Sequence, residues 1–234
     1  MLPESLTFTK TLHSGEDKGC YSVNMTADGH LICGLQGGVE IWNTREGKIK
    51  DYSIIEHHMF DVKQYGDQLY AAWKHDEQLT IVRYDRQLTN GEEVVSIPYY
   101  TNFVTKMDVR YGTIAVVYSK RKLVKLYTTD GEFVRDVKLI GCKAPYGVRL
   151  LMDGCVLVTD YCAGSVAKYQ TDGSGRVVWR CAQLQRASGL DVDEWGIIYI
   201  CGGTNIYVLS PKGRYDVITS SHAIPIIAAD ADII

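Results

Sequence analysis

The sequence predicts an all-β protein built from several copies of one four-stranded unit. Two interleaved series of glycines, each expected in a tight turn, carry this prediction. Members of the first series are 37 to 46 residues apart, and members of the second are 40 to 44 residues apart. Two series with one common spacing indicate an internal repeat. The first series is Gly29, Gly66, Gly112, Gly154 and Gly196, and the second is Gly47, Gly91, Gly131, Gly173 and Gly213.

The segments between these glycines are short and rich in β-branched and aromatic residues. The fourth unit shows this clearly, with YGVRLL, CVLVTDY, SVAKYQ and RVVWRCAQL separated by turn sequences such as MDG and TDGSG. Such segments are typical of strands joined by tight turns. No stretch keeps apolar residues at helical spacing long enough for a helix of about ten residues. Each unit is therefore expected to hold four strands.

Four strands in a repeat of this length predict a β-propeller of four-stranded antiparallel blades. A twisted blade has two apolar faces, and it can bury them only against neighbouring blades. The second strand of each unit is the most apolar, as expected for a strand sandwiched between blades. These strands read LICGL, LYAAW, IAVVY, VLVTD and IIYIC.

The repeats predict a single domain over residues 1–234 with five complete blades. Their expected ranges are about 19–56, 57–100, 101–143, 144–186 and 187–221. The tail 222–234 starts like a further unit, and residues 5–13 resemble a last strand. The sequence thus favours a six-bladed design whose sixth blade is truncated. A five-bladed ring with two frayed ends is the alternative.

Composition narrows the class of protein. The chain has 25 Lys and Arg against 28 Asp and Glu, a net charge of −3, which is too small to steer it strongly to nucleic acid or membrane. Hydrophobic residues make up 46% and charged residues 23%, which excludes disordered and fibrous classes.

The 7 cysteines are odd in number and lack C-x-x-C spacing, which favours buried free thiols. With no signal-peptide pattern and no apolar run of spanning length, we expect a cytoplasmic protein without membrane association.

The fourth and fifth units carry a recognisable repeat motif. In the fourth it comprises Pro145, Gly147, Val148, Asp153, Gly154, Val158, Thr159, Asp160, Asp172 and Gly173, and in the fifth Ser188 to Asp193 and Gly196. This motif resembles the NHL family, six-bladed propellers found in tripartite-motif (TRIM) proteins. The first two units lack the Pro-x-Gly entry, and no unit has the Trp-Asp ending of WD-type propellers. The resemblance implies a propeller that binds a protein partner or, in some members, RNA.

Catalytic signatures are absent from the sequence. It contains no G-x-S-x-G, no G-x-x-x-x-G-K-[ST] and no H-E-x-x-H. Asp160 could be a metal ligand in the central channel, but an Asp that caps its own loop is favoured. The matching positions in the other units are Gly34, Trp73, Tyr118 and Cys201, which are not calcium ligands. We therefore expect no catalytic residue, no cofactor and no metal.

One face of the predicted propeller combines cations with aromatic rings. The loops that join strand four to the next blade share this face with the loops that join strands two and three. Lys120-Arg121-Lys122 is the only dense basic run, and a solvated hairpin loop is its simpler interpretation. The candidate binding residues are Lys18, His57, His58, Lys74, Tyr99, Tyr100, Lys120, Arg121, Lys122, Lys143, Tyr146, Tyr161, Arg186 and His222.

The leading functional hypothesis is a non-catalytic protein-interaction module that docks a protein partner on this face. Single-stranded RNA is the first alternative ligand, because cations suit phosphates and rings suit bases. A metal-dependent propeller hydrolase or lyase is the second alternative. DNA is not an expected partner. The sequence contains no RING motif, so we expect no ubiquitin-ligase activity from this chain.

Overall fold

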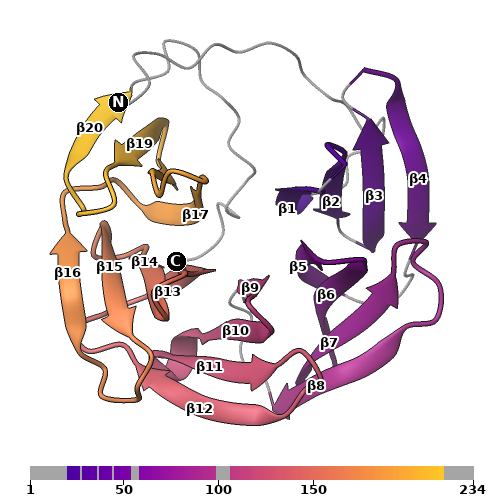
Figure 1. The fold of residues 1–234 in the computed structure, drawn as a ribbon, viewed down its shortest axis with the longest axis horizontal. Coiled ribbons are helices and arrows are strands. Elements are labelled where there is room, and N and C mark those ends of the chain that lie inside the picture. Colours follow the sequence, from indigo (N-terminus) through magenta and orange to yellow (C-terminus); the bar gives the residue numbers. More distant parts are fainter. Residues whose placement is uncertain are drawn as a thin grey trace.

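A computed structural model describes residues 20–26, 28–35, 37–43, 45–53, 58–98 and 106–218. Within these ranges the chain forms twenty strands and one 3-10 turn, η1 (Ser119–Arg121). The strands make five four-stranded antiparallel sheets that radiate around a central axis (Figure 1). This arrangement confirms the predicted all-β propeller with five complete blades. The expected partial sixth blade, residues 222–234 with the strand at 5–13, lies outside the described residues.

Each blade runs outward from the axis in chain order. Blade one contains β1 (Cys20–Met25), β2 (Leu31–Leu35), β3 (Gly38–Asn43) and β4 (Gly47–Ser53). Blade two contains β5 (His58–Tyr65), β6 (Gln68–His75), β7 (Gln78–Asp85) and β8 (Glu92–Pro98). Blade three contains β9 (Met107–Arg110), β10 (Thr113–Tyr118), β11 (Leu123–Thr128) and β12 (Phe133–Lys138). Blade four contains β13 (Pro145–Leu150), β14 (Cys155–Asp160), β15 (Ser165–Gln170) and β16 (Val177–Cys181). Blade five contains β17 (Ala187–Val192), β18 (Ile198–Gly202), β19 (Asn205–Leu209) and β20 (Tyr215–Ile218).

The turn glycines adopt the conformation that their spacing predicts. All of them except Gly91 have a positive φ, the left-handed region that a side chain disfavours. In the turn between β7 and β8, Leu88 and Asn90 have a positive φ instead. The Asp85 carboxylate accepts the backbone N–H of Gln87 and of Thr89, at 3.0 and 2.8 Å, and so stabilises this longer turn.

The hydrophobic core lies between blades, as expected for units that bury both faces against neighbours. Strand β10 shows this best, because Ile114 and Val116 pack toward blade two while Ala115 and Val117 pack toward blade four. All four side chains are fully buried. The prediction that the second strand is sandwiched is therefore confirmed for β6, β10 and β14, whose side chains enter two clusters each, whereas β2 and β18 alternate buried with half-buried residues. No helix in the described part of the chain is long and apolar enough to cross a bilayer.

Side chains join the inner strands of neighbouring blades. Strands β1, β5, β9, β13 and β17 each have one edge that pairs with no other strand. The Ser22 hydroxyl accepts the N–H of Val62 at 3.0 Å, and Asp61 accepts the N–H of Met107 at 3.0 Å. Asp108 accepts the N–H of Leu150 at 2.8 Å. These bonds give acceptors to backbone N–H groups on the unpaired edges of the inner strands and join neighbouring inner strands around the axis.

Candidate binding site at the propeller axis and its loop face

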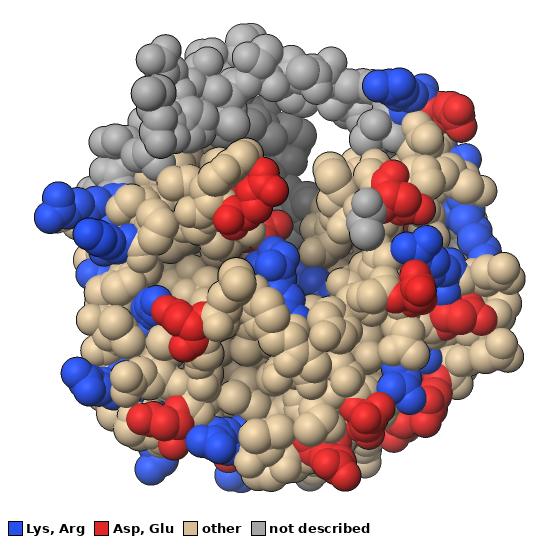
Figure 2. Space-filling view, in the orientation of Figure 1, with Lys and Arg blue, Asp and Glu red and all other residues tan. Residues whose placement is uncertain are grey.

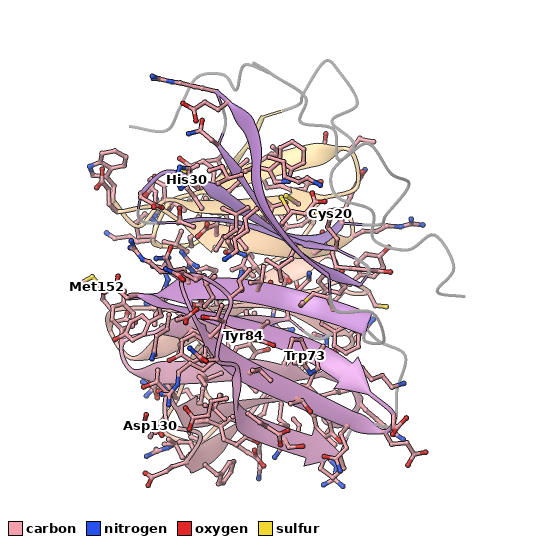
Figure 3. All side chains as sticks on the ribbon, turned by 90° about the vertical axis from the view of Figure 1, so that its right-hand side faces the viewer. Cys20, His30, Trp73, Tyr84, Asp130 and Met152 are labelled. Atoms are coloured by element: carbon pink, nitrogen blue, oxygen red, sulfur yellow. The ribbon has the colours of Figure 1, made fainter. Side chains whose placement is uncertain are left out.

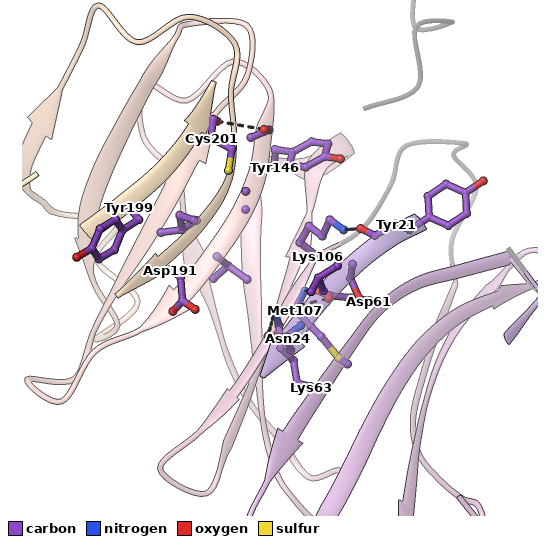
Figure 4. Close-up of a pocket in the computed structure, with 17 residues that line it drawn as sticks. Tyr21, Asn24, Asp61, Lys63, Lys106, Met107, Tyr146, Asp191, Tyr199 and Cys201 are labelled. Atoms are coloured by element: carbon purple, nitrogen blue, oxygen red, sulfur yellow. Dashed lines mark hydrogen bonds and ion pairs between the residues drawn. The ribbon is translucent and has the colours of Figure 1, made fainter. Parts of the chain in front are cut away.

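A cavity of about 250 Å³ lies at the axis, between the inner strands (Figure 4). Residues of all five inner strands and of β18 line it, together with Lys106 just before β9. The wall combines apolar side chains with polar and aromatic groups. They include Tyr21, Asn24, Asp61, Lys63, Lys106, Tyr146, Asp191 and Tyr199.

Lys106 bonds to two neighbouring inner strands. Its Nζ donates to the carbonyl oxygen of Phe60 at 3.2 Å and to that of Tyr21. Burial lowers the pKa of Lys106, and the nearby Asp61 carboxylate opposes that shift. The ammonium group thereby connects β1 and β5 to the start of β9.

Other axial charges pair across blades. Arg149 Nη1 lies 3.1 Å from an Asp108 oxygen, and Arg149 Nη2 lies 2.5 Å from Asp191. Burial raises the pKa of Asp108, an effect that Arg149 and Lys63 oppose. In blade two, Lys63 Nζ donates to Asn24 at 3.0 Å and lies 3.6 Å from Asp61. Among the described residues, no group of three or more His, Cys, Asp and Glu side chains is placed to hold a metal ion.

The face that carries the turns between second and third strands and the connections between blades, here called the loop face, holds all the predicted residues that the structure describes, including Tyr146 and Tyr161. Lys120, Arg121 and Lys122 form the connection between β10 and β11, and all three are exposed. Lys143 precedes β13 and Arg186 precedes β17, and both are exposed. Lys74 lies near the end of β6, and His58 begins β5. The remaining predicted residues lie outside the described ranges: Lys18, His57, Tyr99, Tyr100 and His222.

The structure brings Tyr146 and Tyr161 together. Their ring centroids are 6.1 Å apart, because Pro145 at the start of β13 pairs with Asp160 at the end of β14. Both rings are half-buried. Tyr146 also lines the axial cavity, so the tyrosine pair connects that cavity to the loop face. Lys143, three residues before Tyr146, adds an exposed cation in the preceding loop.

Asp160 is a structural residue, as the sequence favours. Its carboxylate accepts the backbone N–H groups of Lys143, Ala144 and Ala163 at 2.5, 3.0 and 3.0 Å. Burial opposes ionisation of Asp160, but the hydrogen bonds from these N–H groups outweigh it and hold its pKa below the usual range. The carboxylate fixes the two loops that carry the tyrosine pair.

Sequence reasoning missed the axial residues, although a signal for them exists. Three inner strands repeat a polar–Val–polar triplet: Ser22-Val23-Asn24, Asp61-Val62-Lys63 and Asp108-Val109-Arg110. Charged side chains are rarely placed in strands near a core unless they are paired. The recurrence of this triplet at one position of the repeat could have indicated the axial network.

The expectation of buried thiols holds only in part. All seven cysteines are free. Cys142 and Cys181 are buried, and four others are half-buried. Cys162 is exposed, because it lies in the turn between β14 and β15 on the loop face. The prediction of burial is therefore wrong for Cys162.

Comparisons with known proteins support the propeller fold. No protein-family model matches the chain, and no curated protein resembles it in sequence. A protein of unknown function from Bacteroides caccae superposes with a TM-score of 0.69 at 17% identity, covering 93% of this chain and 86% of that one. Virginiamycin B lyase from Staphylococcus aureus has a TM-score of 0.68 at 14% identity, over 89% and 72% of the two chains. A chain of a nidogen–laminin complex has a TM-score of 0.65 at 17% identity, over 82% and 78%. At these identities the likeness shows the fold alone.

Proposed function

We propose that this chain is a non-catalytic protein-interaction propeller, comparable to the NHL propellers of TRIM proteins, and that its partner docks on the loop face. The tyrosine pair at the mouth of the axial cavity is the observation that carries the proposal. Half-buried tyrosines offer a large contact area at a low entropic cost, and each keeps a polar hydroxyl group. Tyr146 and Tyr161 lie on the same face as the exposed cations Lys143 and Arg186.

The roles of the axial charges support binding over catalysis. Asp61 and Asp108 accept backbone amides from neighbouring blades, and Lys106 donates to two backbone carbonyl groups. These groups hold the inner strands in place. A catalytic acid or base must lie within reach of a substrate to exchange a proton with it. The hydrogen bonds of Asp61, Asp108 and Lys106 instead point these charges at backbone groups of neighbouring strands.

The chemistry of the loop face indicates the kind of partner. Exposed cations lie in three loops, at Lys120 to Lys122, at Lys143 and at Arg186. Among the described residues of this face, Asp76 and Glu77, between β6 and β7, are the exposed acidic exceptions. The proposed partner therefore presents carboxylates around an apolar or aromatic side chain that contacts the tyrosine pair.

The test compares the proteins retained by the wild-type chain with those retained by a variant carrying Lys120→Ser, Arg121→Ser, Lys122→Ser and Tyr161→Ser. Affinity isolation with quantitative mass spectrometry is expected to show one or more partners depleted from the variant by about tenfold or more. Arg135→Ser with Arg176→Ser is the matched control, because both residues are exposed, Arg135 in the middle of β12 and Arg176 in the turn between β15 and β16 on the opposite face. Identical partner sets for the wild type and the loop-face variant overturn the proposal.

Single-stranded RNA is the second candidate ligand, favoured by the same exposed run of three cations. A polyanion that contacts Lys120 to Lys122 should bind with a marked dependence on salt. A gel-shift titration with short single-stranded RNAs at two salt concentrations tests this. Salt-sensitive binding that disappears in the triple serine variant assigns the face to RNA, whereas no shift at low salt eliminates RNA.

A further inference from the structure

Each of the five blades has a large, exposed apolar side chain at or beside the turn between its first two strands. These residues are Met25 (65% exposed), Tyr65 (37%), Tyr111 (52%), Met152 (88%) and Trp195 (75%); we call them the hairpin ring. The Tyr65 hydroxyl accepts the N–H of Gly112 at 2.9 Å, so the turns of blades two and three are in contact. Exposed apolar patches with a polar rim mark interaction sites in soluble proteins.

The hairpin ring lies on the side of the propeller opposite the loop face. In Figure 3, Met152 lies at the left edge together with His30 and Asp130, which belong to other turns, and Trp73 near the end of β6 lies toward the right. Because the right-hand side of Figure 1 faces the viewer in Figure 3, the left edge of Figure 3 is the face seen in Figures 1 and 2. A partner on the loop face therefore leaves the hairpin ring accessible.

Carboxylates outnumber cations around the hairpin ring, where the exposed cations are Arg110, directly before Tyr111, and Arg86, beside Asp67. The inner hairpin turns contain no Lys or Arg, and their acidic residues are Asp28, Asp67, Asp153, Asp193 and Glu194. Asp67 pairs with Arg86 at 3.1 Å and is still 88% exposed. In Figure 2, acidic side chains lie above the axis and on both sides of it, and basic side chains lie beside those on the right and in the hollow at the centre.

The axial cations Arg149 and Lys63 are paired and largely buried, whereas Arg110 is 37% exposed and lies 3.8 Å from the Asp108 carboxylate. Arg149 lies between Asp108 and Asp191 and is buried. Lys63 is bonded to Asn24 and lies beside Asp61, with 17% of its side chain exposed. A ligand that approaches this face meets carboxylates before it meets Arg149 or Lys63.

We propose that the hairpin ring is a second docking surface and that its occupant is a protein segment combining Lys or Arg with large apolar side chains. Met25 and Met152 are flexible and fit apolar groups of different shapes. The faces of Trp195 and of the tyrosines attract cations. The carboxylates of the turns supply complementary charge at the edge of the apolar contact, which favours a basic partner over an acidic one.

Three short synthetic peptides serve as probes. One alternates Leu with Lys, the second has Glu in place of Lys, and the third has Ser in place of Leu. Titration of the full chain, followed by fluorescence anisotropy of a dye on the peptide, is expected to show binding of the Leu–Lys peptide at least about tenfold tighter than that of the other two. Equal binding of the Leu–Glu peptide, or of the Ser–Lys peptide, overturns the proposal, and so does the absence of binding by all three.

Variants locate the site. Trp195→Ser with Met152→Ser is expected to weaken binding of the Leu–Lys peptide about tenfold or more. Asp67→Asn with Glu194→Gln is expected to weaken it less and to reduce its dependence on salt. Val134→Ser with Val178→Ser removes exposed apolar groups from the outer strands β12 and β16 and is the matched control. All of these side chains are exposed, so folding is expected to be retained and is checked by thermal unfolding. Unchanged binding by the Trp195/Met152 variant, or an equal loss in the control, overturns the proposal.

Discussion

Asp61 accepts a hydrogen bond of 3.0 Å from the backbone N–H of Met107, and this bond joins the inner strand of blade two to that of blade three. The second Asp61 oxygen accepts the N–H of Val62 at 3.0 Å. An inner strand has no partner on its axial edge, and a buried N–H left without an acceptor costs about 1–3 kcal/mol. The Asp61 carboxylate thus supplies the hydrogen-bond acceptor that a neighbouring strand would otherwise provide.

Replacement of Asp61 by Ala is expected to lower the free energy of unfolding by about 2–3 kcal/mol, because the buried N–H of Met107 then has no acceptor and Lys63 loses the charge beside it. Urea denaturation monitored by circular dichroism measures the loss. Asp67→Ala is the control, since that side chain lies in the turn after the same strand and makes only a surface ion pair, worth roughly 0–1 kcal/mol. Similar losses for the two variants would contradict the proposed role of Asp61.

A turn position can require Gly because of its backbone conformation or because of a close neighbour, and a comparison of Gly131 with Gly29 distinguishes the two reasons. Both have a positive φ, of +88° and +80°. A Cβ at Gly131 would lie 1.8 Å from the carbonyl oxygen of Val94 in blade two, whereas a Cβ at Gly29 meets nothing within 4 Å. Gly29→Ala is expected to cost about 1–2 kcal/mol from backbone strain alone. Gly131→Ala is expected to cost more, because the blades must also move apart, and thermal unfolding of the pair measures the difference. Equal costs would show that packing between blades two and three tolerates the methyl group.

The fold could be predicted from the sequence because its signals are local. A left-handed turn position selects Gly wherever it occurs, and the same turns recur in each blade. Gly91 shows the limit of this argument, since Asn90 takes the left-handed conformation beside it. Gly91 is required for a different reason, because a Cβ there would lie 2.4 Å from Cε1 of the Tyr84 ring.

The candidate site was harder to predict because it depends on contacts between blades. Pro145 and Asp160 pair within one blade, so the loop face could be expected to hold both Tyr146 and Tyr161. Arg149, in contrast, pairs with Asp108 of the preceding blade and with Asp191 of the next one. No local pattern specifies which side chains meet across the axis, since that depends on how each blade is rotated against its neighbour.

Asp160 should make stability depend on pH. Burial opposes ionisation of Asp160, but the stronger effect of three backbone N–H donors holds its pKa below that of the unfolded chain. The stabilisation is therefore present above about pH 4, where an unfolded Asp is ionised, and is lost as the pH falls through the folded-state value. Asp160→Asn should lower the free energy of unfolding at neutral pH by about 1–3 kcal/mol.

The difference between the wild type and Asp160→Asn should shrink as the pH falls below about 4, because the wild-type carboxyl group then takes up its proton. Urea titrations at several pH values measure this convergence. Asp172→Asn, in the exposed turn after β15, is the control and should change stability less. A constant difference between the wild type and Asp160→Asn at all pH values would show that the carboxylate charge plays no part.

The seven thiols should differ in reactivity in an order set by exposure and by pKa. Cys162 is exposed. A hydrogen bond from Cys33 lowers the pKa of Cys20, with a further contribution from Lys106, whereas burial raises the pKa of Cys142 and of Cys181. Because the thiolate is the reactive form, iodoacetamide at neutral pH should modify Cys162 and Cys20 first and the two buried thiols last. Peptide mass spectrometry after a timed quench gives the order, and in denaturant the differences should vanish. Labelling of Cys142 as fast as that of Cys162 in the folded protein would mean that the cluster between blades three and four opens far more readily than its packing indicates.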